Sequence, residues 1–369
     1  MSVEARDAAA HFDPARLKLA RQLQAITRAE VARRAEISAA AVSQLEAGAH
    51  GPRPATLARL ALALAVPVGF FASTGQATLL PAVSDSFFRS LRRTTQRDRE
   101  RAAAHAGLAA ELARVIERSV LLPGVASADD LALDLSDPPG ASEEAAIEIR
   151  KRWNLPDEPV DNVVRVLERH GILVVRSQLA SANVDAFSWA EGARPIVVLG
   201  RDKNVYERSR LDAAHELAHV LLHRADPEPA SPPLERQAQR FAGALLVPRE
   251  HLREEWPPGR IDWGHIQRLR MRWGVSMAAL LYRAKDLELL SHPACVNAMK
   301  YMSRRGWRTR EPGPQRPVEE PILLAEALAL LEDNGIDFDE LVATGHLIAA
   351  DDLRHRLGLS TQRSLRVEI

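Results

Sequence analysis

The sequence predicts a mainly helical protein that contains one small α+β domain. Most of the chain carries apolar residues at helical spacing, separated by short breaks. Only residues 171–175, 184–189 and 195–199 are rich in the β-branched and aromatic residues that are typical of strands. We therefore expect an N-terminal helical bundle, an α+β domain with a short sheet in the middle of the chain, and a helical C-terminal region.

The length and composition limit the classes of protein. A chain of 369 residues exceeds one ordinary core, so two or three domains are expected. Its 49 basic and 49 acidic residues cancel, and a nucleic-acid surface would need a local excess of charge. No run of about 18 apolar residues and no signal-peptide core is present, which predicts a cytoplasmic protein with no membrane partner. The single Cys295 excludes an internal disulfide.

The first 72 residues indicate a bundle of four helices after a short flexible start. Residues 1–11 have no clear period and are predicted to be frayed or disordered. Four helix starts are expected, at Asp13-Pro14, Thr27, Ser38 and Pro54. Asp, Thr and Ser are typical N-cap residues, and Pro suits the first position of a helix. Two of these short helices are joined by a tight turn, an arrangement that can place the second helix in the DNA major groove.

Local charge and residue order both favour DNA binding by this bundle. Residues 12–72 contain eight Lys or Arg residues and four Asp or Glu residues, an excess of positive charge that favours attraction to phosphates. Residues 37–48 and 54–64 closely resemble the Cro/CI (XRE) family of helix-turn-helix domains. The resemblance implies contacts with double-stranded DNA. Its base- or phosphate-facing residues would be Ser38, Ala39, Ala40, Ser43 and Gln44, and its backbone-facing residues Arg28, Arg33 and Arg53.

An alternative for the bundle is a protein-binding role, because three consecutive alanines supply few groups that read bases. Glu46 is expected to brace the helices, since phosphates would repel its carboxylate.

The most informative segment of the chain is His215-Glu216-Leu217-Ala218-His219. No Gly or Pro interrupts it, so the two histidines lie one helical turn apart and can bind one metal ion. Imidazole nitrogens suit Zn²⁺, and Glu216 can take a proton from the attacking water. This HExxH pattern predicts a zinc peptidase, provided that a third ligand exists.

The best candidate for the third ligand is Glu235. Residues 226–233 contain four prolines and must form a loop, after which a helix begins at Leu234. Glu235 falls on the apolar stripe of this helix, where an unpaired carboxylate would be costly unless it bound a cation. The alternative is a carboxylate bonded to amides at the helix start. Asp226, Glu228 and Glu250 are weaker candidates for the ligand.

Residues 208–223 and 235–248 resemble the ImmA/IrrE family of zinc metallopeptidases. This resemblance implies a zincin-like α+β peptidase domain, with His215, His219 and Glu235 as ligands and Glu216 as the catalytic base. Gln239 and Val247 replace residues common in the family, but neither touches the proposed chemistry. For the oxyanion donor or a residue that supports a ligand, the candidates are Tyr206, Arg210, Asp212, His223 and His251.

Together these patterns predict five segments. They are a flexible N-terminus at 1–11, the XRE-type domain at 12–72, a linker or docking segment at 73–98, the zinc peptidase domain at 99–260 and the helical C-terminal region at 261–369. Residues 321–331 and 338–359 of the last segment are amphipathic enough for a helical cap or a homodimer surface.

The leading functional hypothesis is a bacterial stress-response regulator that binds DNA and cleaves a protein, such as a transcriptional repressor. Its zinc endopeptidase would be latent until a signal arrives. The main alternative is a transcription factor whose peptidase-like domain is a catalytically silent sensor or dimerisation module. A third hypothesis is a peptidase whose N-terminal helices recruit a partner protein.

Overall fold

The computed structural model describes residues 3–73, 75, 78, 95–126, 129–133, 138, 140–177, 186–190, 194–201, 204–223 and 231–359. These residues form seventeen α-helices and a three-stranded sheet, which confirms the predicted fold class. Most of the linker predicted at 73–98 lies outside the described residues. Among the helices described, none is both long and apolar enough to cross a membrane.

The predicted N-terminal bundle contains helices α2 (Pro14–Leu23), α3 (Arg28–Ala35), α4 (Ala39–Glu46) and α5 (Pro54–Leu64). The side chains of Asp13, Thr27 and Ser38 each accept a hydrogen bond from a backbone N–H in the first turn of the helix that follows. These bonds satisfy amides that the helix leaves unpaired. The starts predicted for the first three helices of the bundle are therefore confirmed.

The N-terminus differs from the expected flexible segment. Val3–Ala10 form helix α1, which buries Ala5 and Ala8 and packs on α5 and on the short 3-10 helix Val68–Phe71. The backbone of residues 11–13 then pairs with that of residues 71–73. Small alanine side chains allow this close packing, and the tertiary contacts order a segment whose own sequence has no clear period.

The sheet consists of β1 (Leu173–Ser177), β2 (Ala186–Trp189) and β3 (Ile196–Gly200), as the strand-like segments predicted. The strand order is β1-β3-β2, with β1 parallel and β2 antiparallel to β3. Alternate residues face opposite sides of the sheet, so Phe187 and Trp189 enter one hydrophobic core, here the first core, while Ala186 enters the second core. The sheet is therefore covered on both faces.

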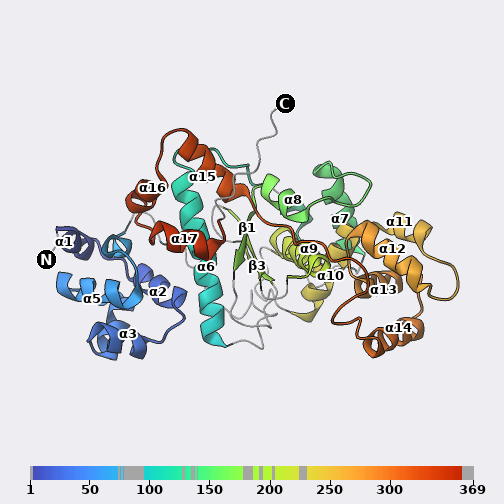
Figure 1. Ribbon diagram of the computed structural model, residues 1–369, viewed down its shortest axis with the longest axis horizontal. Helices are drawn as coiled ribbons and strands as arrows, with labels where there is room; N and C mark the ends of the chain where they lie inside the picture. Colours follow the sequence, from blue (N-terminus) through green and yellow to red (C-terminus); the bar gives the residue numbers. More distant parts are fainter. Residues whose placement is uncertain are drawn as a thin grey trace.

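Helix α6 (Gln96–Ile116) covers the first face of the sheet and is central to the first core (Figure 1). It also packs against α2 of the N-terminal bundle. Helices α15 (Leu323–Asp333), α16 (Phe338–Thr344) and α17 (Ala350–Leu357) complete this core. The many alanines of α6 let neighbouring helices approach closely on several sides.

Helix α9 (Tyr206–Leu222) lies on the second face of the sheet, beside α8 (Val163–Arg169). It packs against α10 (Pro232–Leu246), which in turn packs on α7 (Ala141–Arg152). The second core continues away from the sheet. Its outer helices are α11 (Arg249–Glu255), α12 (Trp263–Trp273), α13 (Met277–Asp286) and α14 (His292–Arg304).

The C-terminal segment after residue 261 contributes to both cores, because the chain returns from α14 to the first core through residues 305–322. Glu319 anchors residues 305–322 to the second core. Its carboxylate accepts hydrogen bonds from the N–H groups of Val163 and Val164 at the start of α8, and it also forms an ion pair with buried Arg210. Glu168 of α8 in turn accepts from the amide of Ile322. The buried carboxylates of Glu319 and Glu168 thus have hydrogen-bond partners, which offset the cost of removing their charge from water.

Candidate metal centre

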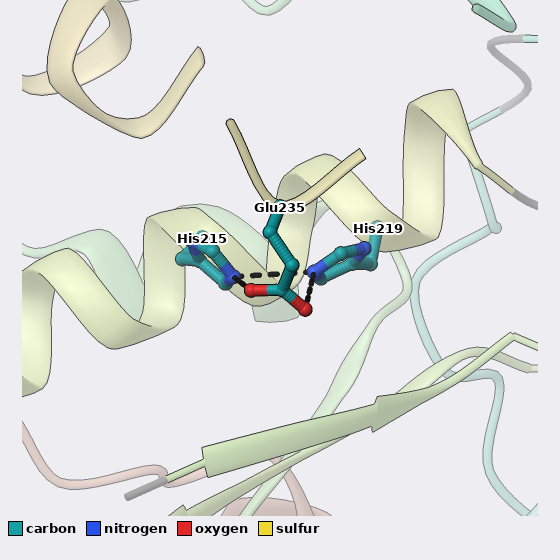
Figure 2. Close-up of side chains that lie close together, drawn as sticks. All are labelled: His215, His219 and Glu235. Atoms are coloured by element: carbon teal, nitrogen blue, oxygen red, sulfur yellow. Dashed lines mark hydrogen bonds and ion pairs between the residues drawn. The ribbon is translucent and has the colours of Figure 1, made fainter. Parts of the chain in front are cut away.

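Three side chains on two packed helices form a candidate metal site. His215 and His219 lie one turn apart on α9, and Glu235 reaches them from the first turn of α10 (Figure 2). Their side chains are 18%, 14% and 28% exposed, respectively. The site is therefore open to solvent on one side, as a catalytic metal site must be.

The spacing of the three donor atoms fits a tetrahedral ion. The two histidine Nε2 atoms are 3.1 Å apart, and the Glu235 oxygens lie 3.5 Å from His215 Nε2 and 3.9 Å from His219 Nε2. With bonds of roughly 2.0–2.1 Å, a tetrahedral Zn²⁺ separates its ligand atoms by about 3.3 Å. The predicted group of two histidines and one glutamate is thus brought together at spacings that one ion can bridge.

Glu216 lies next to the first histidine but faces the sheet. Ser188 Oγ donates a hydrogen bond to Glu216 Oε2 at 2.7 Å. Burial raises the pKa of the Glu216 carboxyl to about 7, although His215 and the bond from Ser188 oppose the shift. A carboxylate with a pKa in this range is suited to exchange protons with a substrate near neutral pH.

Sequence reasoning missed Ser188 as a site residue. Ser188 has the same parity in β2 as Ala186, so its side chain points to the face that α9 covers. The available signal was a hydroxyl in a strand whose other residues are all apolar and buried. A buried hydroxyl needs a hydrogen-bond partner, and Glu216 is the acceptor on the helix above it.

His219 is held by a chain of polar contacts that starts at its second ring nitrogen. His219 Nδ1 lies 3.0 Å from His223 Nδ1, and His223 Nε2 lies 3.0 Å from Gln237 Oε1. If Nε2 of His219 binds a metal, its Nδ1 carries the proton and donates to His223, which then donates to Gln237. All three groups are neutral in this arrangement, consistent with the lowered pKa that burial gives His219.

The other candidates for supporting residues have different neighbours. Arg210 donates to the backbone oxygens of Val160 and Asp161 and to Glu319, and it lies over the ring of Tyr206. Asp212 is 3.9 Å from Arg208, and His251 pairs with Asp157. Of these candidates, His223 contacts a ligand histidine directly, and the charge of Asp212 also acts on His215.

Two of the weaker candidates for the third ligand, Asp226 and Glu228, lie outside the described residues. Glu250 is on α11, where it accepts a hydrogen bond from Arg249 at 2.8 Å, and it is not part of the cluster.

The N-terminal bundle presents the residues expected to meet DNA. Ser38, Ala39, Ala40, Ser43 and Gln44 are all exposed at the start and along one side of α4. Glu46, at the end of this helix, accepts hydrogen bonds from Arg21 at 2.5 Å and Arg28 at 2.7 Å. It therefore braces the bundle as predicted.

The three arginines expected at the DNA backbone differ in their pairing. Arg28 pairs with Glu46 and Arg33 with Glu30, both at 2.7 Å. Arg53 is exposed, and no carboxylate among the described residues pairs with it. Arg53 is consequently the most available of the three for a phosphate.

Two family models match separate parts of the chain. Residues 17–71 match a family model described as helix-turn-helix. Residues 167–285, which include all three metal-site residues, match the peptidase M78 model described as IrrE N-terminal-like domain. A comparison with curated proteins finds no significant match. The chain therefore combines an XRE-type helix-turn-helix DNA-binding domain with an IrrE N-terminal-like domain of the M78 metallopeptidase family.

Proposed function

We propose that this protein is a DNA-binding transcriptional regulator that hydrolyses a peptide bond in another regulatory protein, with zinc held by His215, His219 and Glu235. The observation that carries this proposal is the meeting of the three donor atoms on α9 and α10 at spacings that suit a tetrahedral ion. Bound Zn²⁺ would supply a Lewis acid for the scissile carbonyl.

The residues around the metal have separate tasks in this mechanism. Glu216 accepts a proton from the attacking water and passes it to the nitrogen of the leaving group. Ser188 holds the Glu216 carboxylate in place through the 2.7 Å hydrogen bond. His223 and Gln237 orient the ring of His219.

An extended substrate would lie along β2. In the order β1-β3-β2, strand β2 has β3 on one side and no described strand on the other. Its residue Ser188 contacts Glu216, so this edge borders the reacting groups. A peptide that adds as a further strand would hydrogen-bond through its backbone. This mode places the substrate beside the base without requiring a particular side chain.

The test compares the wild-type chain with Glu216→Gln. Each is co-expressed with the repressor-like proteins encoded next to its gene, and new protein N-termini are identified by mass spectrometry. We expect one zinc per chain in both proteins and a cleavage product only with the wild type. Full zinc occupancy with no product, or the same product from Glu216→Gln, would favour the silent-sensor alternative.

The DNA-binding part of the proposal has its own test. Fluorescence anisotropy with the promoter of its own gene should show binding that weakens as salt rises. Arg53→Ala should weaken binding to all sequences and reduce the salt slope by about one, whereas Gln44→Ala should mainly reduce sequence preference. Arg260→Ala, outside the helix-turn-helix domain, is the control. Absent or salt-independent binding would instead support recruitment of a partner protein.

A further inference from the structure

A pocket is lined by residues of α13 and α14 and by Arg308, which follows α14. Both helices belong to the second core and lie away from the sheet (Figure 1). The volume of the pocket is about 650 Å³, and none of the three metal-site residues lines it. Pockets of roughly 300–1,000 Å³ typically hold small molecules. The size and the concave shape therefore suit a compact ligand better than a duplex or a large protein surface.

The floor of the pocket is apolar. Cys295 and Met299 of α14 form it, and their side chains are buried. Tyr282 of α13 and Val296 of α14 line the same pocket and are 46% and 37% exposed. Large apolar side chains that gather at a solvent-exposed hollow are typical of a binding site.

Positive charge surrounds this apolar floor. Lys285, Lys300, Arg304 and Arg308 line the pocket, and none of its lining residues is acidic. Lys285 pairs with Asp286 at 3.0 Å. For the other three cations, no carboxylate among the described residues lies within ion-pair distance. All three are exposed, so a ligand can reach them from solvent.

Aromatic packing holds α14 in place on the side away from the pocket. Tyr301 of α14 stacks on Trp263 of α12 with ring centroids 4.8 Å apart, and Trp307 meets both rings edge-on. The α14 wall of the pocket is thus fixed without a ligand. A preformed site loses less conformational entropy on binding than a flexible one.

We propose that this pocket binds a small organic anion with an apolar, preferably aromatic, body. The body lies on Cys295 and Met299 beside the ring of Tyr282, and the anionic group lies between Lys300, Arg304 and Arg308. The charge complementarity of the rim selects the anion, and the apolar floor distinguishes it from an inorganic ion. The site is additional to the proposed peptidase and does not depend on it.

The test uses 8-anilinonaphthalene-1-sulfonate as a fluorescent probe and the full chain, with and without a zinc chelator. We expect saturable binding to one site in the micromolar range, unchanged by the chelator. Naphthalene-1-sulfonate should displace the probe, whereas sulfate and 1-naphthol at the same concentration should not. Equal displacement by sulfate would indicate a simple ion site, and equal displacement by 1-naphthol a purely apolar one; either result overturns the proposal.

Variants locate the site. Lys300→Glu combined with Arg304→Glu changes two exposed side chains of α14 and should weaken probe binding at least tenfold. Arg260→Glu combined with Arg310→Glu is the matched control, because it reverses two exposed charges that do not line the pocket. Val296→Glu should weaken binding by placing a charge beside the apolar floor. Circular dichroism checks that each variant is folded. Similar weakening by the control, or none by the pocket variants, would overturn the assignment.

Discussion

Ser188 on β2 and Glu216 on α9 are joined by a buried hydrogen bond of 2.7 Å that connects the sheet to the reacting end of the candidate metal site. The bond depends on two regular features of the fold. The alternation of β2 directs Ser188 to the face under α9, and the helical repeat turns Glu216 toward that face while His215 and His219 point elsewhere. The sheet therefore positions the proposed base and is more than a scaffold.

The first prediction concerns this bond. Ser188→Ala should lower the rate of substrate cleavage roughly 5- to 30-fold, because one hydrogen bond of about 1–2 kcal/mol no longer positions Glu216. Zinc content should not change, since Ser188 does not touch a ligand. The cleavage product found with the wild-type chain provides the assay, and kcat should fall more than KM rises.

The control for this variant is Ser142→Ala. Ser142 is also a buried serine, but its hydroxyl has no hydrogen-bond partner among the described residues. If Ser142→Ala slows cleavage as much as Ser188→Ala, the effect is a general loss of packing and not a loss of positioning.

Much of this site could be predicted from the sequence. The spacing of His215 and His219 on an uninterrupted helix determines their common face, and the apolar stripe of the next helix singles out Glu235. Ser188 and Gln237 could not be identified in this way, because their roles depend on which element packs over them. Local periodicity carries no information about that packing.

The N-terminal helix and the C-terminal helices show the same limit. Helix α1 is ordered by burial of Ala5 and Ala8 against the bundle, and small alanines give little signal in the sequence. Helices α15–α17 are amphipathic as predicted; α15 and α17 pack on α6, and the apolar residues of all three helices join the first core. An amphipathic pattern predicts that a face is covered without indicating what covers it.

The second prediction tests the third ligand. Glu235→Ala should lower zinc affinity at least 100-fold, because the two histidines alone leave the ion with only two protein ligands. Zinc per chain is measured by atomic emission after dialysis against a competing chelator. Glu250→Ala, which removes an exposed carboxylate paired with Arg249, is the control and should retain one zinc. Retention of tightly bound zinc by Glu235→Ala would exclude Glu235 as a ligand.

The third prediction concerns the residues that orient His219. Gln237→Leu removes the acceptor for His223 and should reduce zinc affinity about 10- to 100-fold, since the ring and tautomer of His219 are then less well fixed. Gln239→Leu provides a matched control, because it makes the same change at an exposed position two residues along α10. A chelator competition titration compares the two. Equal affinities would show that the contacts of His223 and Gln237 do not support the metal site.

The last prediction is a pH dependence of stability that arises away from the metal site. His105 of α6 lies buried against Ser177 of β1, and their side chains are hydrogen-bonded. Burial, with a smaller contribution from the charges of Arg101 and Arg356, lowers the pKa of His105 to about 3. In the unfolded chain the pKa returns to about 6.5.

The difference between the folded and unfolded pKa of His105 determines how its contribution to stability changes with pH. Below pH 6.5 the unfolded state binds a proton that the folded state does not, so His105 reduces the free energy of unfolding by about 1.4 kcal/mol for each pH unit until pH 3. The His105 contribution to stability is fully present above pH 6.5 and is lost as the pH falls. His105→Gln should remove this part of the slope, as measured by urea unfolding between pH 6.5 and 4.5. His355→Gln, on α17 and solvent-accessible, is the control; slopes identical to the wild type in both variants would show that His105 is not protonated on unfolding in this range.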